Sequence, residues 1–306
     1  MARLKYPFIA LAGLSAAAAL LLLLAGGRGE RRVLPQAPFG AERVAVVELT
    51  GIMTGSQDAG SRATSARRVV EQLEKHRDDA TVKAVVLRID SPGGTVVAAQ
   101  EITAALGRLR GAGKKLVTSM GDMAASGGFY VACGTDHIVA SPGTLTGSIG
   151  VIMQFPNYQG LFGKLGLSTN TIKSGEFKDV GNGAREMTER DRRLLQALVD
   201  DVQGQFVAAV AAGRRMRPDR VGELADGRVY SGRQAKELGL VDELGDLDTA
   251  IAAASRLAGI AGKPEVLREK PRRRLWEMLD ARFAALFPAP LQSESYLEGR
   301  PLYLWQ

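Results

Sequence analysis

Apolar runs alternate with helix-like stretches along the first half of the chain. Three runs are rich in aliphatic and β-branched residues and predict buried strands, at 43–51, 82–90 and 114–120. Two stretches repeat apolar residues at helical spacing and predict helices, at 64–79 and 95–113. A segment rich in glycine and serine predicts further short strands around a turn, at 137–153. Strands that alternate with helices in this way predict an α/β fold with a largely parallel sheet.

Beyond residue 187 the pattern becomes helical. Thr188 and Asp191 have the spacing of a helix-capping pair, S/T-x-x-D/E. Apolar positions follow at helical spacing: Leu194, Leu195, Leu198, Val202 and Phe206. We therefore expect a long helix that packs against the sheet or against a partner subunit.

The N-terminal segment carries no charge between Lys5 and Arg28. As a helix these 22 residues span about 33 Å at about 1.5 Å each, close to the roughly 30 Å of a bilayer core. Arg3 and Lys5 predict that the N-terminus stays in the cytoplasm. A cleaved signal peptide is the alternative, because the run ends in small residues. Either reading places the rest of the chain outside the cytoplasm.

These features divide the chain into four parts. The expected parts are an anchor or uncleaved signal at 1–27, a linker at 28–43, the main domain at 44–262 and a basic tail at 263–306. The tail contains a basic amphipathic stretch, which is typical of an ordinary surface helix or of a helix that lies on a membrane.

Charge and cysteine content exclude several classes of protein. The formal net charge is +7, but residues 44–262 carry 26 basic and 25 acidic side chains, so the excess lies in the ends. This distribution argues against a nucleic-acid partner. The single cysteine, Cys133, excludes an internal disulfide and a cysteine-based metal cluster. Metal-ligand spacings and a P-loop are also missing from the sequence, so we expect no cofactor or metal.

Ser126 is the candidate nucleophile. It stands in the stretch MAASGGFY between two alanines and two glycines, and these small neighbours let a substrate backbone approach closely. Neither of the two histidines is well placed to act as a general base for Ser126. His76 lies in a charged helical stretch that is expected to face solvent, and His137 opens a predicted strand as an edge residue. A histidine-based triad is therefore poorly supported.

A lysine is the other base that serine proteases use. At its ordinary pKa of about 10.4 a lysine is protonated at neutral pH, so burial must lower the pKa of a lysine base. Lys173 and Lys178 in the segment IKSGEFKD are candidates, with Ser148 in LTGSIG as a hydroxyl that orients the amine. The residues alone do not choose between the two lysines.

Backbone N–H groups for the oxyanion come from glycines. Gly93 and Gly94 follow a predicted buried strand in DSPGG, and Gly127 follows Ser126. Both places can present N–H donors to a developing negative charge. The alternative is a plain strand-to-helix turn, because S-P-G-G is strong turn chemistry by itself.

Five motifs occur here in the order found in the signal peptide peptidase A family: DSPGG, MAASGGFY, SPGTLTGSIGVI, IKSGEFKD and VYSGRQAKELGLVDELG. Over residues 44–260 the chain resembles the short form of that family, which has one catalytic domain. The resemblance implies a Clp-protease/crotonase-like fold of repeated ββα units with a largely parallel sheet. It also implies a C-terminal helical region and an N-terminal transmembrane helix.

The resemblance also assigns roles to residues by their place in the motifs. It implies a Ser/Lys dyad without cofactor or metal, and these site residues: Ser126 as nucleophile, Lys178 rather than Lys173 as general base, Ser148 as the lysine-orienting hydroxyl, and Gly93, Gly94 and Gly127 at the oxyanion.

The implied function is that of a membrane-anchored serine endopeptidase acting on remnant signal peptides or other apolar peptides. The resemblance further implies a ring-like homo-oligomer in the cell (inner) membrane, with a single pass and an extracytoplasmic catalytic domain. Three alternatives remain: a Ser/Lys membrane protease with one specific protein substrate, a crotonase-type acyl-CoA enzyme, and a non-catalytic scaffold. The exported placement argues against the acyl-CoA enzyme, because coenzyme A is cytosolic.

Overall fold

The computed structural model describes residues 42–55, 63–268 and 302–304. None of the helices in this part of the chain combines the length and the apolar character needed to cross a bilayer. The expected anchor at 1–27, most of the linker and most of the basic tail lie outside the described residues.

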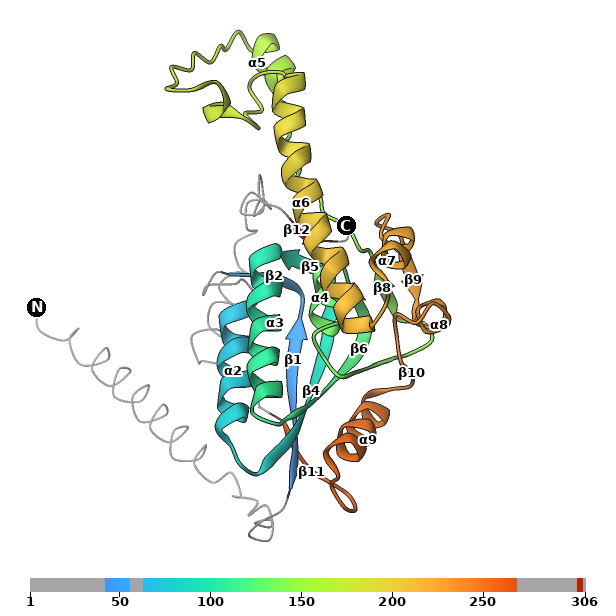
Figure 1. Cartoon of the computed structure of the whole chain (residues 1–306). Helices are drawn as coiled ribbons and strands as arrows, with labels where there is room; N and C mark the ends of the chain where they lie inside the picture. Colours follow the sequence, from blue (N-terminus) through green and yellow to red (C-terminus); the bar gives the residue numbers. More distant parts are fainter. Residues whose placement is uncertain (1–41, 56–62, 269–301, 305–306) are drawn as a thin grey trace, which may run out of the picture. The chain divides into compact units, whose positions relative to one another are not determined.

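The described strands and helices follow one another along the chain (Figure 1). The strands are β1 (Arg43–Thr50), β2 (Ile52–Thr54), β3 (Ala63–Ser65), β4 (Val82–Ser91), β5 (Gly93–Thr95), β6 (Lys115–Ala125), β7 (His137–Ala140), β8 (Leu145–Gly147), β9 (Val229–Ser231), β10 (Glu243–Leu244), β11 (Glu265–Arg268) and β12 (Leu302–Leu304). The helices are α2 (Ala66–Asp78), α3 (Val96–Gly111), α4 (Gly127–Ala132), α5 (Gln159–Lys164), the 3-10 helix η1 (Glu176–Asp179), α6 (Glu189–Arg214), α7 (Pro218–Leu224), α8 (Gly232–Glu237) and α9 (Leu247–Ala258).

The larger sheet has the strand order β10-β7-β6-β4-β1-β11, and all of these neighbours pair in parallel. β8 pairs in parallel with the carboxyl-terminal end of β6, and β9 pairs antiparallel with β8. The predicted α/β fold with a largely parallel sheet is confirmed. β11, which falls within the stretch assigned to the tail, pairs with β1 at the edge of this sheet.

Both faces of the central strands are buried, which explains their continuous apolar runs. Successive residues of a strand point to opposite faces, and the core divides accordingly. Val47 and Leu87 belong to the cluster that α2, α3, α4 and the second half of α6 complete. Val46 and Val86 belong to the cluster on the other face, which α9 completes. Parallel strands covered on both sides by helices give the layers seen in Figure 1.

A smaller sheet lies next to the end of β4 and has the order β12-β5-β2-β3. β2 pairs in parallel with β3 and with β5, whereas β12 pairs antiparallel with β5. β5 is the glycine turn of the DSPGG motif, so this sheet holds the predicted oxyanion turn in place.

The expected helix start beyond residue 187 is confirmed. Thr188 and Asp191 form a reciprocal capping box at the N-terminus of α6, with the Asp191 N–H donating to Thr188 Oγ1 at 3.1 Å. The second half of α6 packs in the core through Phe206 and Val210. In the first half, Leu194 and Leu198 are exposed.

The two histidines and the cysteine have structural places. His76 was expected to face solvent, and that prediction is wrong, because it is only 4% exposed. It continues the buried stripe of α2 that begins at Ala66, Val69 and Leu73. His137 opens β7 as expected, and its Nε2 lies 3.0 Å from Glu243 Oε2. Cys133 is buried as expected, and burial raises the pKa of its thiol to about 12.

Candidate active site

Ser126 occupies a sharp turn between β6 and α4. Its backbone has φ 51° and ψ −117°, a region that residues other than glycine rarely adopt, and such strain is typical of functional sites. The turn is fixed by its own main chain, since the Ser126 N–H donates to the carbonyl of Gly147 at 2.8 Å and its carbonyl accepts from the Tyr130 N–H at 2.9 Å. The side chain is fully buried, and its Oγ has no hydrogen-bond partner among the described residues.

Ser148 lies beside Ser126. In the parallel pairing of β6 with β8, Ala125 is opposite Gly147, so the two serines follow paired residues. Ser148 also has a positive φ, 49°, and its N–H donates to the carbonyl of Arg228 at 2.8 Å. The structure therefore brings the predicted nucleophile and the predicted lysine-orienting hydroxyl to neighbouring strand ends.

An irregularity in β6 precedes the nucleophile. Ile89 pairs with Met120, but Ser91 pairs with Ala124, so β6 has extra residues between these two positions. Asp90 fills the interruption by accepting the backbone N–H of Met123 at 3.1 Å. Bulges redirect a strand, and this one lies immediately before the turn that carries the nucleophile.

The glycines of the DSPGG turn are required for two different reasons. Gly93 has φ 115°. Glycine adopts such a positive φ readily because it has no Cβ. A Cβ on Gly94 would lie 2.0 Å from the carbonyl oxygen of Met53 in β2. The Gly93 N–H donates to Ser91 Oγ at 3.1 Å, so that donor is already engaged. The N–H groups of Gly94 and Gly127 have no side-chain partner among the described hydrogen bonds, and Gly94 is paired in the sheet with Met53 and Tyr303.

Ser91 is a supporting residue that the sequence did not single out. Its hydroxyl is fully buried and donates to the carbonyl of Gly51 at 2.6 Å while accepting from Gly93. It thus joins the end of β1 to the predicted oxyanion turn. The sequence signal for this role is its place inside DSPGG, where a serine before proline and two glycines indicates only a turn.

The edge of β5 accepts an extended segment of chain. β12 pairs with it antiparallel, with Leu302 opposite Thr95, Tyr303 opposite Gly94 and Leu304 opposite Gly93. β12 also contacts α4, the helix that begins directly after Ser126. An extended backbone can therefore lie along the glycine turn next to the nucleophile.

The two candidate lysines differ in their surroundings. The Lys173 amine donates to Asp179 Oδ1 at 2.6 Å and to the carbonyl of Glu176 at 2.8 Å. Lys178 lies on η1 and is exposed, and no hydrogen bond or ion pair of its amine occurs within the described part of the chain. Because the Ser126 Oγ is buried without a partner, one chain does not by itself bring Ser126 and Lys178 into hydrogen-bond contact.

These features define a class of protein. A buried serine on a strained strand-to-helix turn, beside a glycine turn and an edge that holds an extended segment, is the arrangement of a serine hydrolase that acts on peptides. The model of Peptidase family S49 matches residues 108–261. The chain belongs to this family.

Curated relatives agree with this assignment. The chain is 44% identical over 219 residues to a putative protease of Synechocystis sp., covering 72% of this chain and 76% of the relative. It is 38% identical over 217 residues to a putative signal peptide peptidase SppA of Enterococcus faecium, covering 69% and 63%. It is 34% identical over 262 residues to protease 4 of Salmonella typhi, covering 82% of this chain and 42% of that protein.

The resemblance drawn from the five motifs is thereby confirmed, and the chain is a serine-type peptidase. The acyl-CoA enzyme and the non-catalytic scaffold lose their support with this assignment. The chain spans less than half of the length of protease 4.

Proposed function

We propose that this chain is a membrane-anchored serine endopeptidase that cleaves remnant signal peptides and other apolar peptides, with Ser126 as nucleophile and Lys178 as general base. The observation that carries the proposal is Ser126, whose backbone is strained and whose buried hydroxyl has no partner among the described residues, close to the strand β5 that pairs with the extended segment β12. A nucleophile with no hydrogen-bond partner needs a base, and none of the described residues of the same chain forms a hydrogen bond with its hydroxyl.

The proposed mechanism gives each of these groups one role. A peptide binds along β5 in the place that β12 takes in this structure. Ser126 Oγ attacks the scissile carbonyl while the neutral amine of Lys178 takes the hydroxyl proton. The N–H groups of Gly127 and Gly94 stabilise the oxyanion of the tetrahedral intermediate. Lys178 then returns the proton to the leaving amine, and water hydrolyses the acyl-enzyme. Ser148 orients the lysine amine from its place beside Ser126.

Lys178 is preferred to Lys173 because of their contacts. Lys173 already donates to a carboxylate and to a main-chain carbonyl of its own segment, which gives it a structural task. Lys178 leaves η1 toward solvent with its amine uncommitted among the described contacts. This difference agrees with the role that the motif IKSGEFKD implies for Lys178.

A second copy of the chain supplies the base in this proposal. The region around η1 exposes several large apolar side chains: Leu161, Leu165, Leu167 and Ile172, each more than half exposed. Exposed apolar surface of this kind is typical of an interface. Burial there removes water from Lys178, and the desolvation favours the neutral amine that a base requires. We therefore propose a ring-like homo-oligomer in which Ser126 of one copy meets Lys178 of the next.

The membrane placement rests on the sequence. The uncharged run of 22 residues before Arg28 has the length of a bilayer span, and Arg3 and Lys5 favour a cytoplasmic N-terminus. We propose a single pass through the cell (inner) membrane with the catalytic domain outside the cytoplasm. Apolar peptides that remain in the bilayer after protein export are then within reach of the site.

Substrate choice gives a first test. The full chain in detergent micelles should cut peptides from a library within apolar segments, because the segment paired with β5 is itself apolar, Leu302–Leu304. Cleavage products are identified by mass spectrometry, with the Ser126→Ala chain as control. Cleavage spread over many apolar peptides supports the proposal. Cleavage of none of these peptides, together with cutting of a single membrane protein, favours the protease with one specific substrate.

A further inference from the structure

One arginine, Arg185, holds the segment that presents Lys178. Its Nε donates to Asp179 Oδ2 and its Nη2 to Asp179 Oδ1, both at 3.0 Å. Nη2 also donates to the main-chain carbonyl of Asp179 at 3.2 Å. The guanidinium therefore binds the residue directly after Lys178 by side chain and by main chain. Bidentate pairs of this kind fix orientation as well as distance.

The same guanidinium is anchored to α6. Its Nη1 donates to Asp191 Oδ2 at 2.6 Å, and Asp191 is only 2% exposed. Asp191 is the acidic member of the capping box, and it accepts from the Thr188 N–H at 3.1 Å. Arg185 thus connects η1 to a buried and well-fixed point at the start of a long helix.

Charge strengthens this connection. Hydrogen bonds from Arg185 hold the pKa of Asp191 at about 2 and the pKa of Asp179 well below its usual value. Both carboxylates therefore remain charged at neutral pH. Arg190 also links α6 to η1, through an ion pair with Glu176 whose side chains are 62% and 49% exposed and through a guanidinium that lies 5.5 Å from the centroid of the Phe177 ring. Such exposed pairs contribute little, because solvent screens them.

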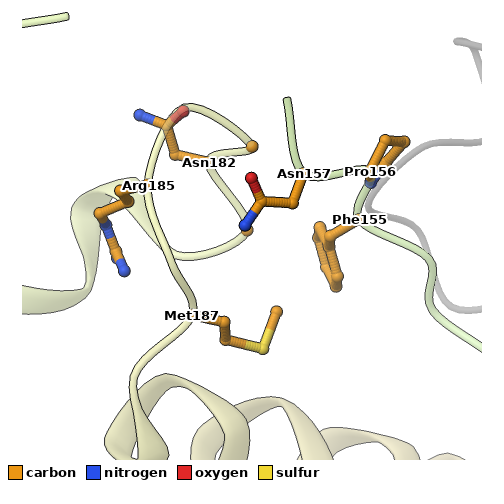
Figure 2. Close-up of a pocket in the computed structure, with 8 residues that line it drawn as sticks. Phe155, Pro156, Asn157, Asn182, Arg185 and Met187 are labelled. Atoms are coloured by element: carbon orange, nitrogen blue, oxygen red, sulfur yellow. The ribbon is translucent and has the colours of Figure 1, made fainter. Parts of the chain in front are cut away.

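Arg185 also borders a small cavity. A cavity of about 30 Å³ lies between residues 155–157 and 181–187, with Arg185 among the residues that line it. Figure 2 shows Phe155 and Arg185 on opposite sides of this cavity, with Asn157 and Met187 between them. The cavity has room for a water molecule, and the guanidinium at its edge is held by directed hydrogen bonds to Asp179 and Asp191.

We propose that Arg185 is a positioning residue for the general base: it fixes the direction in which Lys178 leaves η1, and with it the place of the amine in the dyad. This inference rests on the proposed function, in which Lys178 is the base. Arg185 acts through Asp179, the neighbour of Lys178 in the chain, and not by contact with the substrate.

The first test is a kinetic comparison in the full chain. Arg185→Gln removes the bidentate pair and should lower kcat for a quenched apolar peptide about 10²-fold, because a misplacement of about 1 Å has an effect of that order. KM should change little, and Arg185→Lys, which keeps the charge, should recover part of kcat. The matched control is Arg192→Gln in the first turns of α6, where the ion pair with Glu189 is exposed and 3.6 Å long. This control should match the wild type.

A double variant separates positioning from a merely structural role. In a Lys178→Ala background, Arg185→Gln should lower the residual rate no further. A second loss of equal size, an unchanged kcat in Arg185→Gln alone, or a loss of kcat that accompanies a smaller assembly by light scattering contradicts the inference. Failure of the proposed function is distinguishable, because it appears as normal activity of Lys178→Ala alone.

Discussion

Ser126→Ala will abolish peptide hydrolysis by the full chain, with kcat/KM reduced about 10³-fold or more, the effect expected when a nucleophile is removed. The substitution should leave the thermal unfolding midpoint unchanged. The Ser126 Oγ has no hydrogen-bond partner among the described residues, so its removal leaves no buried polar group unpaired. Steady-state cleavage of a quenched apolar peptide and differential scanning calorimetry measure the two results.

A fluorophosphonate probe supplies the control for this prediction. The probe should label the wild-type chain at Ser126 and leave Ser126→Ala unlabelled. Ser174→Ala changes an exposed serine four residues before Lys178, and it should be labelled as the wild type is. Labelling of Ser126→Ala at the wild-type rate would mean that another residue is the nucleophile.

Lys178→Ala is expected to lower peptide hydrolysis almost as much as Ser126→Ala does. Without the base, the Ser126 proton has no acceptor, and kcat should fall about 10³-fold. Removing one residue of a catalytic unit lowers the rate nearly as much as removing the whole unit. Lys173→Ala should lower kcat much less, because it removes the contacts of Lys173 with Asp179 and with the Glu176 carbonyl while Arg185 still holds Asp179. The comparison is made at a fixed pH on the same quenched peptide, with oligomer mass checked for each variant.

The histidine alternative provides the outcome that would contradict this assignment. His137 bonds to Glu243 at the opening of β7, so His137→Ala should retain activity. Normal turnover in Lys178→Ala together with its loss in His137→Ala would exclude the Ser/Lys dyad. Greater loss in Lys173→Ala than in Lys178→Ala would move the base to Lys173.

Local patterns predicted the parallel sheet and the start of α6 because the causes of both are local. The apolar runs of β1 and β4 follow from burial on both faces of a parallel sheet, and the capping box of α6 follows from two residues three apart. Each of these features can be recognised within one short segment.

Other features depend on contacts that the sequence does not reveal. His76 is buried because the apolar stripe of α2 continues one turn further than its charged neighbours indicate. The engagement of the Gly93 N–H by Ser91 separates two adjacent glycines that look alike in the sequence. The network from Asp179 through Arg185 to Asp191 joins an irregular segment to a helix, and irregular segments carry no periodicity from which to predict it.

Mixing two inactive variants tests the shared dyad most directly. Ser126→Ala keeps Lys178, and Lys178→Ala keeps Ser126, so a site built from two neighbouring copies can contain both intact residues. With equal co-expression of the full chains, random assembly into a ring gives intact dyads at roughly one quarter of the sites, and we predict about that fraction of wild-type activity. A mixture no more active than either variant alone would contradict a dyad shared between copies.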